Sequence, residues 1–387
     1  MNAFFLFTAV FGVVTGCVRA SAPAVFSVYA TGEEVLETGP SRVLFAGNSL
    51  YDIVARVDQS VVDSLKVDEG VSNGITPEAS KKLEEQLEVL AKNPGGSAAN
   101  IARAYCFCGG KGAYFGVHGT DNLGYEFDEF LSSYGVDLEV VHRPDTFTSQ
   151  LYNLITPDAD RSQHFLMGAS ETISESDIDQ SIMDKYDYVA ITGFMVGTPH
   201  RVAFVDKLVA AAFTRQKKLI IFLSDMMCVR KWGDKLKVLA DQATYISGTL
   251  EEYSLLYNLE KPDELLDFFV EKTKGEYPEH KAVIMTMGHA GAIVIFQGKI
   301  FFVPPTGVDV VDTTGAGDFF AGSMLCGLLN GYSVAQASEF ARAVVGDVIS
   351  KYGTSVSSSV HDKIEQIKQS SYGDLKRAAA EEENNVA

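Results

Sequence analysis

Hydrophobic and polar residues alternate in blocks along most of this chain, and the blocks predict alternating strands and helices. Short apolar runs predict strands at 43–47, 113–117, 187–192, 218–223, 282–287, 291–296 and 300–303. Amphipathic or wholly apolar segments predict helices at 76–92, 97–108, 123–134, 199–216, 261–274, 318–330 and 333–350. This alternation favours a central, mostly parallel sheet with helices on both faces, so we expect an α/β fold.

Three shorter apolar runs depart from this pattern, at 137–141, 150–155 and 163–167. Turn residues such as those of 157–160 separate them, which is typical of short antiparallel strands. We therefore expect a small antiparallel sheet beside the main one. Such a sheet would act as a lid, with lid segments near 53–60 and 137–168.

The two ends of the chain have a different composition from the middle. Residues 3–14 are apolar and are followed by the small residues of 20–22, a pattern that resembles a signal peptide more than a membrane span. We predict a targeting segment at 1–22, the alternative being a passive extension. A linker at 23–41, one folded domain at 42–360 and a helix with a flexible tail at 361–387 complete the predicted organisation. No later stretch is long and apolar enough to span a membrane. The sequence does not decide the cellular compartment.

The charge and the cysteine pattern exclude some classes of function. The formal net charge is −19 and there is no basic run, which argues against a protein that binds nucleic acid through its phosphates. The five cysteines form no CxxC pair and no Cys/His cluster with zinc spacing, so we expect buried free thiols. His118, His289 and the other histidines lack partner spacing, which favours solvent-exposed or capping roles.

The strongest chemical signal is the segment from Asp312 to Asp318, with the sequence Asp-Thr-Thr-Gly-Ala-Gly-Asp. It follows the strand-like residues 308–311 and precedes an apolar helix. Small residues let backbone N–H groups approach an anion closely, and the start of a helix carries partial positive charge. Asp318 beside such an anion hole could accept a proton from an attacking hydroxyl. The alternative is that residues 312–318 form a capped, glycine-rich turn with no catalytic role.

Other nucleotide-binding motifs are absent from the sequence. A GxGxxG motif would need glycine where Phe320 stands, and the chain has no P-loop. The catalytic and metal-binding signatures of protein kinases are absent too.

These residues carry a resemblance to the PfkB/ribokinase family of carbohydrate and nucleoside kinases, over roughly residues 43–360. The segment Asp312–Asp318 is similar to the family's C-terminal signature. Residues 95–100, Gly-Gly-Ser-Ala-Ala-Asn, resemble its N-terminal substrate motif. Residues 47–52, Gly-Asn-Ser-Leu-Tyr-Asp, resemble the end of its first strand, and 119–124 match a further stretch. The resemblance implies a ribokinase-like fold with a small β lid.

For catalysis and the acceptor, the resemblance implies roles that we assign residue by residue. The catalytic group would be the base Asp318. The anion hole for the γ-phosphate of ATP would be the backbone of Gly315, Ala316 and Gly317. The hydroxyl groups of a small-molecule acceptor would be held by Asp52, Gly96 and Asn100. This chemistry needs positioning and charge stabilisation rather than covalent catalysis.

The resemblance also implies ATP and cation sites. ATP would contact Thr286 and Gly288, and K⁺ or another monovalent cation would bind near Asp312 and Thr314. Mg²⁺ would be held through water by Glu252. The family often shows Asn-x-x-Glu at this last position, whereas this chain has Thr249-Leu250-Glu251-Glu252, which we interpret as altered metal handling.

The choice of acceptor rests on the long segment 53–94, which separates Asp52 from the Gly-Gly motif. An insertion of this kind resembles the adenosine kinase branch, so an adenosine-like nucleoside is the favoured acceptor. A kinase for a free pentose or hexose is the alternative, because Ser97-Ala98-Ala99 is also common among sugar kinases. A non-catalytic nucleotide-binding relative is a third hypothesis, supported only by Thr249. We expect a monomer or homodimer.

Overall fold

The computed structural model describes residues 40–65, 67–68, 73–157, 161–275, 279–371 and 374–375. The targeting segment predicted at 1–22, nearly all of the linker predicted at 23–41 and most of the predicted tail lie outside these residues. In the described part, no helix has both the length and the apolar composition needed to cross a membrane.

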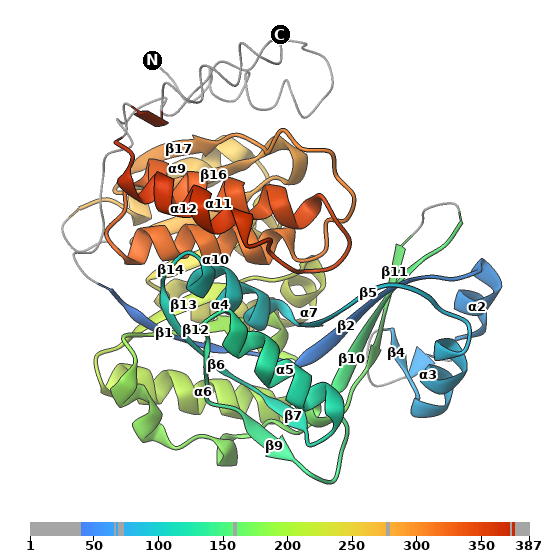
Figure 1. The fold of residues 1–387 in the computed structure, drawn as a ribbon. Coiled ribbons are helices and arrows are strands. Elements are labelled where there is room, and N and C mark those ends of the chain that lie inside the picture. Colours follow the sequence, from blue (N-terminus) through green and yellow to red (C-terminus); the bar gives the residue numbers. More distant parts are fainter. Residues whose placement is uncertain are drawn as a thin grey trace.

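A nine-stranded sheet forms the centre of the larger lobe (Figure 1). Its strands lie in the order β17 (Lys299–Val303), β16 (Ala292–Phe296), β15 (Ala282–Thr286), β14 (Tyr245–Thr249), β13 (Lys218–Phe222), β12 (Tyr188–Thr192), β1 (Arg42–Ala46), β6 (Lys111–Phe115) and β8 (Asp137–Leu138). Neighbours from β8 to β15 pair in parallel, whereas β15, β16 and β17 pair antiparallel. The predicted mostly parallel sheet is confirmed.

Helices cover both faces of this sheet. One hydrophobic cluster joins it to α4 (Ser97–Phe107), α5 (Asn122–Ser133), α10 (Ala316–Leu329), α11 (Val334–Ile349) and α12 (Ser359–Gln369). A second joins its other face to α6 (Pro199–Thr214), α7 (Met226–Gln242), α8 (Leu250–Tyr257) and α9 (Pro262–Lys272). Val43 and Phe45 of β1 belong to the first cluster, and Leu44 and Ala46 to the second. Because successive side chains point to opposite faces, a strand buried on both sides reads as a continuous apolar run.

A second, six-stranded sheet forms the smaller lobe, which projects from the larger one (Figure 1). Its order is β3 (Val67–Asp68), β4 (Gly74–Ile75), β11 (Arg161–Leu166), β10 (Ser149–Ile155), β2 (Leu50–Arg56) and β5 (Glu88–Gly95). The helices α2 (Gln59–Ser64) and α3 (Pro77–Glu84) belong to the same lobe. Tyr51, Ile53, Leu83 and Tyr152 lie in a hydrophobic core of its own.

The remaining elements are short. A parallel pair of strands consists of β7 (Val117–Gly119) and β9 (Val141–Arg143). Short 3₁₀ helices are η1 (Ala169–Thr172), η2 (Glu175–Asp177), η3 (Gln180–Lys185), η4 (Gly193–Val196) and η5 (Gly288–Ala290).

The small sheet corrects two of our expectations. Runs 150–155 and 163–167 do lie in it, as β10 and β11, but β10 pairs in parallel with β2, so the sheet is mixed and not antiparallel. Run 137–141 does not belong to it, because Ala113 of β6 pairs with Asp137 and draws β8 into the large sheet.

Two other predicted elements are wrong. The helix predicted at 76–92 ends at Glu84, and its second half is β5, which pairs antiparallel with β2. Pro94 is tolerated in β5 because this strand lies at the sheet's edge, where one side needs no ladder hydrogen bonds. Residues 308–311, predicted as strand-like, form a loop in which Val310 is 60% exposed.

Helix α10 carries the glycine-rich segment at its start and packs closely on α4. A Cβ built on Gly322 would lie 2.4 Å from the carbonyl oxygen of Ile101 and 2.8 Å from the Cβ of Ala104. This close approach of the two helices fixes where their N-termini lie relative to each other.

Gly322→Ala should therefore lower the free energy of unfolding by about 1–3 kcal/mol, because the added methyl group overpacks this contact. Urea denaturation measures the change. The control is Gly233→Ala in α7, where an added Cβ meets nothing within 4 Å and stability should hold or rise slightly. Equal stability of the two variants would contradict the packing argument.

Candidate active site

A cavity of about 410 Å³ lies between the two lobes. The smaller lobe contributes Asp52, Leu151 and Phe165, and the larger lobe contributes the N-terminal residues of α4 and α10. Further lining residues follow the ends of β12 and β13. Ligands of open α/β sheets bind in such crevices beyond the carboxyl ends of parallel strands.

Asp318 lies at the start of α10. The helix begins at Ala316 after Gly315, whose φ of 72° is left-handed, so Asp318 is the third helical residue and not the first as expected. The amide of Ala316 donates to the carbonyl oxygen of Thr313 at 3.1 Å, closing the turn. A Cβ on Gly317 would meet nothing within 4 Å, which leaves open space beside the helix N-terminus.

Two side chains of α4 hold the carboxylate of Asp318. Ser97 Oγ donates to Oδ1 at 2.6 Å, and Asn100 Nδ2 donates to Oδ2 at 3.0 Å. Burial raises the pKa of Asp318 to about 6, and the two donors oppose this rise because they favour the charged form. A carboxyl group with a pKa near neutrality is suited to accept and release a proton.

Arg103, about one turn further along α4, holds the side chain of Asn100 in place. Its guanidinium is fully buried and donates to Asn100 Oδ1 and, at 2.7 Å, to the carbonyl oxygen of Thr354. Both ends of the Asn100 amide are thus engaged within the protein. Asn100, predicted to hold the acceptor, lies in the cavity wall but here positions Asp318.

Asp52 is the third residue of β2, in the smaller lobe, and is 4% exposed. Burial raises its pKa to about 7, an effect that the charge of Arg103 opposes and that of Asp318 increases. The backbone of Gly96, where φ is 89°, forms a hydrogen bond with Asp52. Its Oδ1 has no hydrogen-bond partner among the described residues. A buried acceptor without a donor fits a site for a ligand hydroxyl group.

Glu252 and Thr249 form a capping box at the start of α8. Thr249 N donates to Glu252 Oε2 at 2.8 Å, and Glu252 N donates to Thr249 Oγ1 at 3.1 Å. Burial raises the pKa of Glu252 to about 7, and the charge of Asp225 adds to the rise. Asp225 lines the cavity, whereas Glu252 does not. Threonine at 249 thus has a structural role that asparagine could also fill.

Asp312 fastens the glycine-rich segment to its surroundings. Its Oδ1 accepts from Thr314 N at 3.1 Å and from Thr314 Oγ1 at 2.7 Å, and its Oδ2 accepts from Gly353 N at 3.2 Å. The side chain is 2% exposed. Both oxygens therefore hold the loop in its folded shape, in addition to any contact with a cation.

A second cavity, of about 640 Å³, adjoins the same loop. It is lined by residues 306–308 and by Arg342, Gly346 and Asp347 of α11. The amides of Val311 and Asp312 donate to the carbonyl oxygen of Ile349, which ties the loop to α11 beside this cavity. Segment 306–318 thus connects the walls of the two cavities.

Thr286 and Gly288 lie outside the first cavity, at the end of β15. They do not line the second cavity either. The turn after β15 packs on the segment that precedes this cavity's residues 306–308, since a Cβ on Gly291 would lie 2.2 Å from the carbonyl oxygen of Val303 and 3.1 Å from Pro305 N.

Sequence reasoning missed several cavity residues. Arg201 is 6% exposed, donates to Glu171 Oε2 at 2.6 Å and leaves its Nε without a partner among the described residues. Lys231 and Trp232 come from α7, for which no helix was predicted. A charged residue within a largely apolar helix, as at Arg201 in α6 or Arg103 in α4, is the signal that could have identified these two arginines.

Comparisons with known proteins point to one family. A family described as pfkB family carbohydrate kinase matches residues 67–361. The chain is 25% identical to 5-dehydro-2-deoxygluconokinase of Geobacillus thermodenitrificans, covering 74% of this chain and 87% of that protein. It is also 25% identical to aminoimidazole riboside kinase of Salmonella typhimurium, covering 69% and 81%.

Among solved structures, adenosine kinase from Sinorhizobium meliloti superposes with a TM-score of 0.72 at 24% identity, covering 85% of this chain and 99% of that one. This likeness shows the ribokinase-like fold.

Ser97→Ala should raise the pKa of Asp318 above its value of about 6, because a donor that stabilises the charged form is lost. A hydrogen bond to a charged group is worth about 1.5–3 kcal/mol. Carboxyl ¹³C NMR titration measures the pKa. Ser133→Ala, on the exposed side of α5, is the control and should leave it unchanged. A pKa that stays or falls in Ser97→Ala would show that Ser97 does not hold the carboxylate.

Proposed function

Because this chain belongs to the pfkB family of carbohydrate kinases, which phosphorylate sugars or nucleosides with ATP, we propose that it transfers the γ-phosphate of ATP to a hydroxyl group of an adenosine-like nucleoside. Asp318 is the proposed base, and the N-terminus of α10 with Gly315, Ala316 and Gly317 is the proposed anion site.

The composition of the first cavity carries the choice of a nucleoside. Its wall combines the unpaired carboxylate oxygen of Asp52 with the apolar side chains of Phe165, Phe194, Met227 and Trp232. A ribose with a purine base presents hydroxyl groups to the carboxylate oxygen and a flat apolar surface to the apolar side chains. A free sugar carries hydroxyl groups on all sides and would leave the aromatic wall uncovered.

The smaller lobe supports the same choice. Segment 53–94, which suggested the adenosine kinase branch, builds most of this lobe outside β10 and β11. Asp52 and Leu151 lie on its paired strands β2 and β10 and both line the cavity.

The proposed reaction follows from the contacts of Asp318. An acceptor hydroxyl in the first cavity donates to the carboxylate, which takes its proton as the oxygen attacks the γ-phosphorus. The bond between the γ-phosphorus and the bridging oxygen of ATP breaks at the same time, and ADP leaves with that oxygen. Ser97 and Asn100 keep the carboxylate aimed during this step. The positive end of α10 stabilises the negative charge on the transferred group.

ATP is proposed to approach from the second cavity. Transfer in line requires the acceptor and the leaving group on opposite sides of the phosphorus, and segment 306–318 connects the walls of the two cavities. Val308, 40% exposed, and Val310, 60% exposed, offer an apolar surface for a base. Contact of ATP with Thr286 and Gly288, which the resemblance implies, remains part of the proposal.

Cations are proposed at two places. Asp225 and Glu252 form an acidic pair suited to Mg²⁺ through water, and Mg²⁺ neutralises phosphate charge when it binds with ATP. Asp312 and Thr314 keep their proposed role for K⁺, although the hydrogen bonds of Asp312 already stabilise this loop.

A kinase for a free sugar or sugar acid is the second candidate. Arg201 and Lys231 line the first cavity, and a cation with an unpaired buried N–H favours an oxygen-rich acceptor. The third hypothesis, a non-catalytic relative, loses its support because Thr249 has a structural role and Asp318 keeps its donors.

Asp318→Asn should lower kcat by a factor of about 10² to 10⁴ while ATP affinity holds, because the base is lost but the shape remains. Initial rates with Mg-ATP measure this, with Asp263→Asn on the exposed face of α9 as control. In the wild type, the rate should fall as the pH drops through about 6, where Asp318 becomes protonated. Activity of Asp318→Asn within a few-fold of wild type would remove Asp318 from the reaction.

Asp52→Ala should lower kcat/KM for adenosine by roughly 10- to 150-fold and leave the KM for ATP unchanged, since a hydrogen bond to a charged group is worth about 1.5–3 kcal/mol. The measurement compares adenosine, 2′-deoxyadenosine, ribose and fructose, with Asp58→Ala in the same lobe as the control.

Equal use of adenosine by Asp52→Ala and wild type would exclude Asp52 from the acceptor site. Strong activity on a free sugar with none on adenosine would keep the site and replace the substrate.

A further inference from the structure

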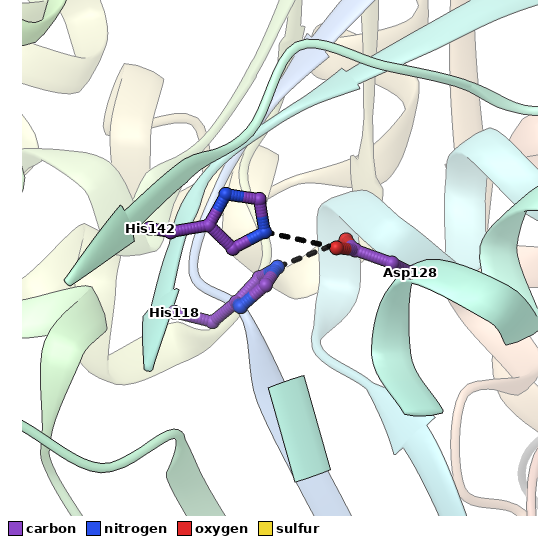
Figure 2. A group of neighbouring side chains, drawn as sticks. All are labelled: His118, Asp128 and His142. Carbon is purple, nitrogen blue, oxygen red and sulfur yellow. Dashed lines mark hydrogen bonds and ion pairs between the residues drawn. The ribbon is translucent and has the colours of Figure 1, made fainter. Parts of the chain in front are cut away.

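Three residues far apart in the sequence meet outside the proposed active site. His118 lies on β7, Asp128 on α5 and His142 on β9 (Figure 2). His118 Nε2 is 2.9 Å from Asp128 Oδ1, and His142 Nε2 is 3.0 Å from Asp128 Oδ2. One ligand atom from each of the three residues lies within 4.8 Å of the others. The expectation of exposed or capping roles for His118 is wrong, since its side chain is fully buried.

The hydrogen bond of the other ring nitrogen determines what His118 presents to Asp128. His118 Nδ1 is 2.9 Å from the carbonyl oxygen of Gly119, which can only accept, so Nδ1 carries a proton. In a neutral ring, Nε2 then directs a lone pair at the carboxylate of Asp128. Two acceptors in contact repel each other unless a cation lies between them. Metal-binding histidines are typically oriented in this way, by an N–H bond to a backbone carbonyl.

We propose that His118, Asp128 and His142 bind one divalent transition-metal ion, with zinc the best match. Two imidazoles and one carboxylate form a donor set suited to zinc, and three protein ligands leave a fourth position for water. The side chains of Asp128 and His142 are 21% and 39% exposed, so this position faces solvent.

Zinc binding would require the side chains to adjust. Donor atoms bound at about 2.0–2.1 Å to a tetrahedral zinc ion lie about 3.3 Å apart. The present contacts of 2.9 and 3.0 Å involve different oxygens of Asp128, and one donor atom from each residue lies within 4.8 Å of the others, so the donors would have to turn toward a common centre. A proton on His118 would compete with zinc for the place between His118 and Asp128. Burial lowers the pKa of His118, but its hydrogen bonds, above all that to Asp128, raise the pKa overall.

The position of the site suggests what the metal does. Gly119 N, directly after His118, donates to Thr148 Oγ1 at 3.2 Å, and Asp121 Oδ2 accepts from Thr148 N at 2.8 Å. Thr148 precedes β10, whose Leu151 lines the first cavity. A bound ion would therefore join β7, β9 and α5 beside the base of the smaller lobe. Its contribution is to stability, because a ligand that binds only the folded state shifts unfolding by mass action.

The test is zinc binding by the full chain after removal of metals with a chelator. Zn²⁺ is titrated in competition with a chromophoric chelator, in the presence of excess Mg-ATP so that acidic groups of the proposed active site are occupied. Wild type should bind one ion per chain, and zinc should raise its Tm. His142→Gln and Asp128→Asn should bind more than about 100-fold more weakly, since even outer partners of a metal site change affinity by 10- to 100-fold.

The control is His361→Gln, which removes an exposed histidine outside the cluster and should bind zinc as wild type does. Cobalt(II) substitution gives a second readout, because its visible spectrum reports nitrogen and oxygen ligands in a tetrahedral site. The absence of zinc binding to wild type at micromolar concentration, or equal binding by wild type and His142→Gln, would overturn the proposal.

Discussion

Two carboxylates, Asp52 and Asp318, lie in the wall of one cavity, and the fully buried guanidinium of Arg103 is the nearby positive charge that opposes the rise of both pKa values. Removing like charges from water costs free energy unless an opposite charge and hydrogen bonds compensate. Arg103 is held in turn by Thr354 and by the faces of Phe130 and Phe319. The geometry of the site therefore depends on α4, which carries Ser97, Asn100 and Arg103 on one side.

The core places this network at the junction of the lobes. Helices α4 and α10 approach so closely at Gly322 that their N-terminal residues lie beside each other at the cavity. Asp52 reaches the same place from β2, where the backbone of Gly96 contacts it. The pKa values of about 7 for Asp52 and about 6 for Asp318 follow from this enclosure. The two acids differ in their partners, because Asp318 has two side-chain donors whereas one oxygen of Asp52 has none among the described residues.

The sequence predicted features that depend on local pattern. Buried parallel strands such as β1 and β12 read as apolar runs, and the loop Asp312–Asp318 was recognisable from its small residues. Features that depend on tertiary pairing were missed. Leu83, Leu87 and Leu90 recur at helical spacing, yet pairing with β2 makes residues 88–95 a strand. β14 was missed because Ser247 and Gly248 interrupt its apolar run. The sequence spacing of Arg103 and Asn100 does not reveal their hydrogen bond. The spacing of His118 and His142 does not reveal that the two side chains meet.

The central claim is that Asp318 contacts the attacking hydroxyl group while the N-terminus of α10 binds the γ-phosphate. A crystal structure of the protein with a non-hydrolysable ATP analogue and its preferred acceptor tests it most directly. We expect an acceptor oxygen about 2.6–3.2 Å from a carboxylate oxygen of Asp318, with the γ-phosphate against the Gly315–Gly317 backbone. An acceptor whose hydroxyl groups all lie beyond hydrogen-bond reach of Asp318, or a γ-phosphate bound away from α10, would contradict the account.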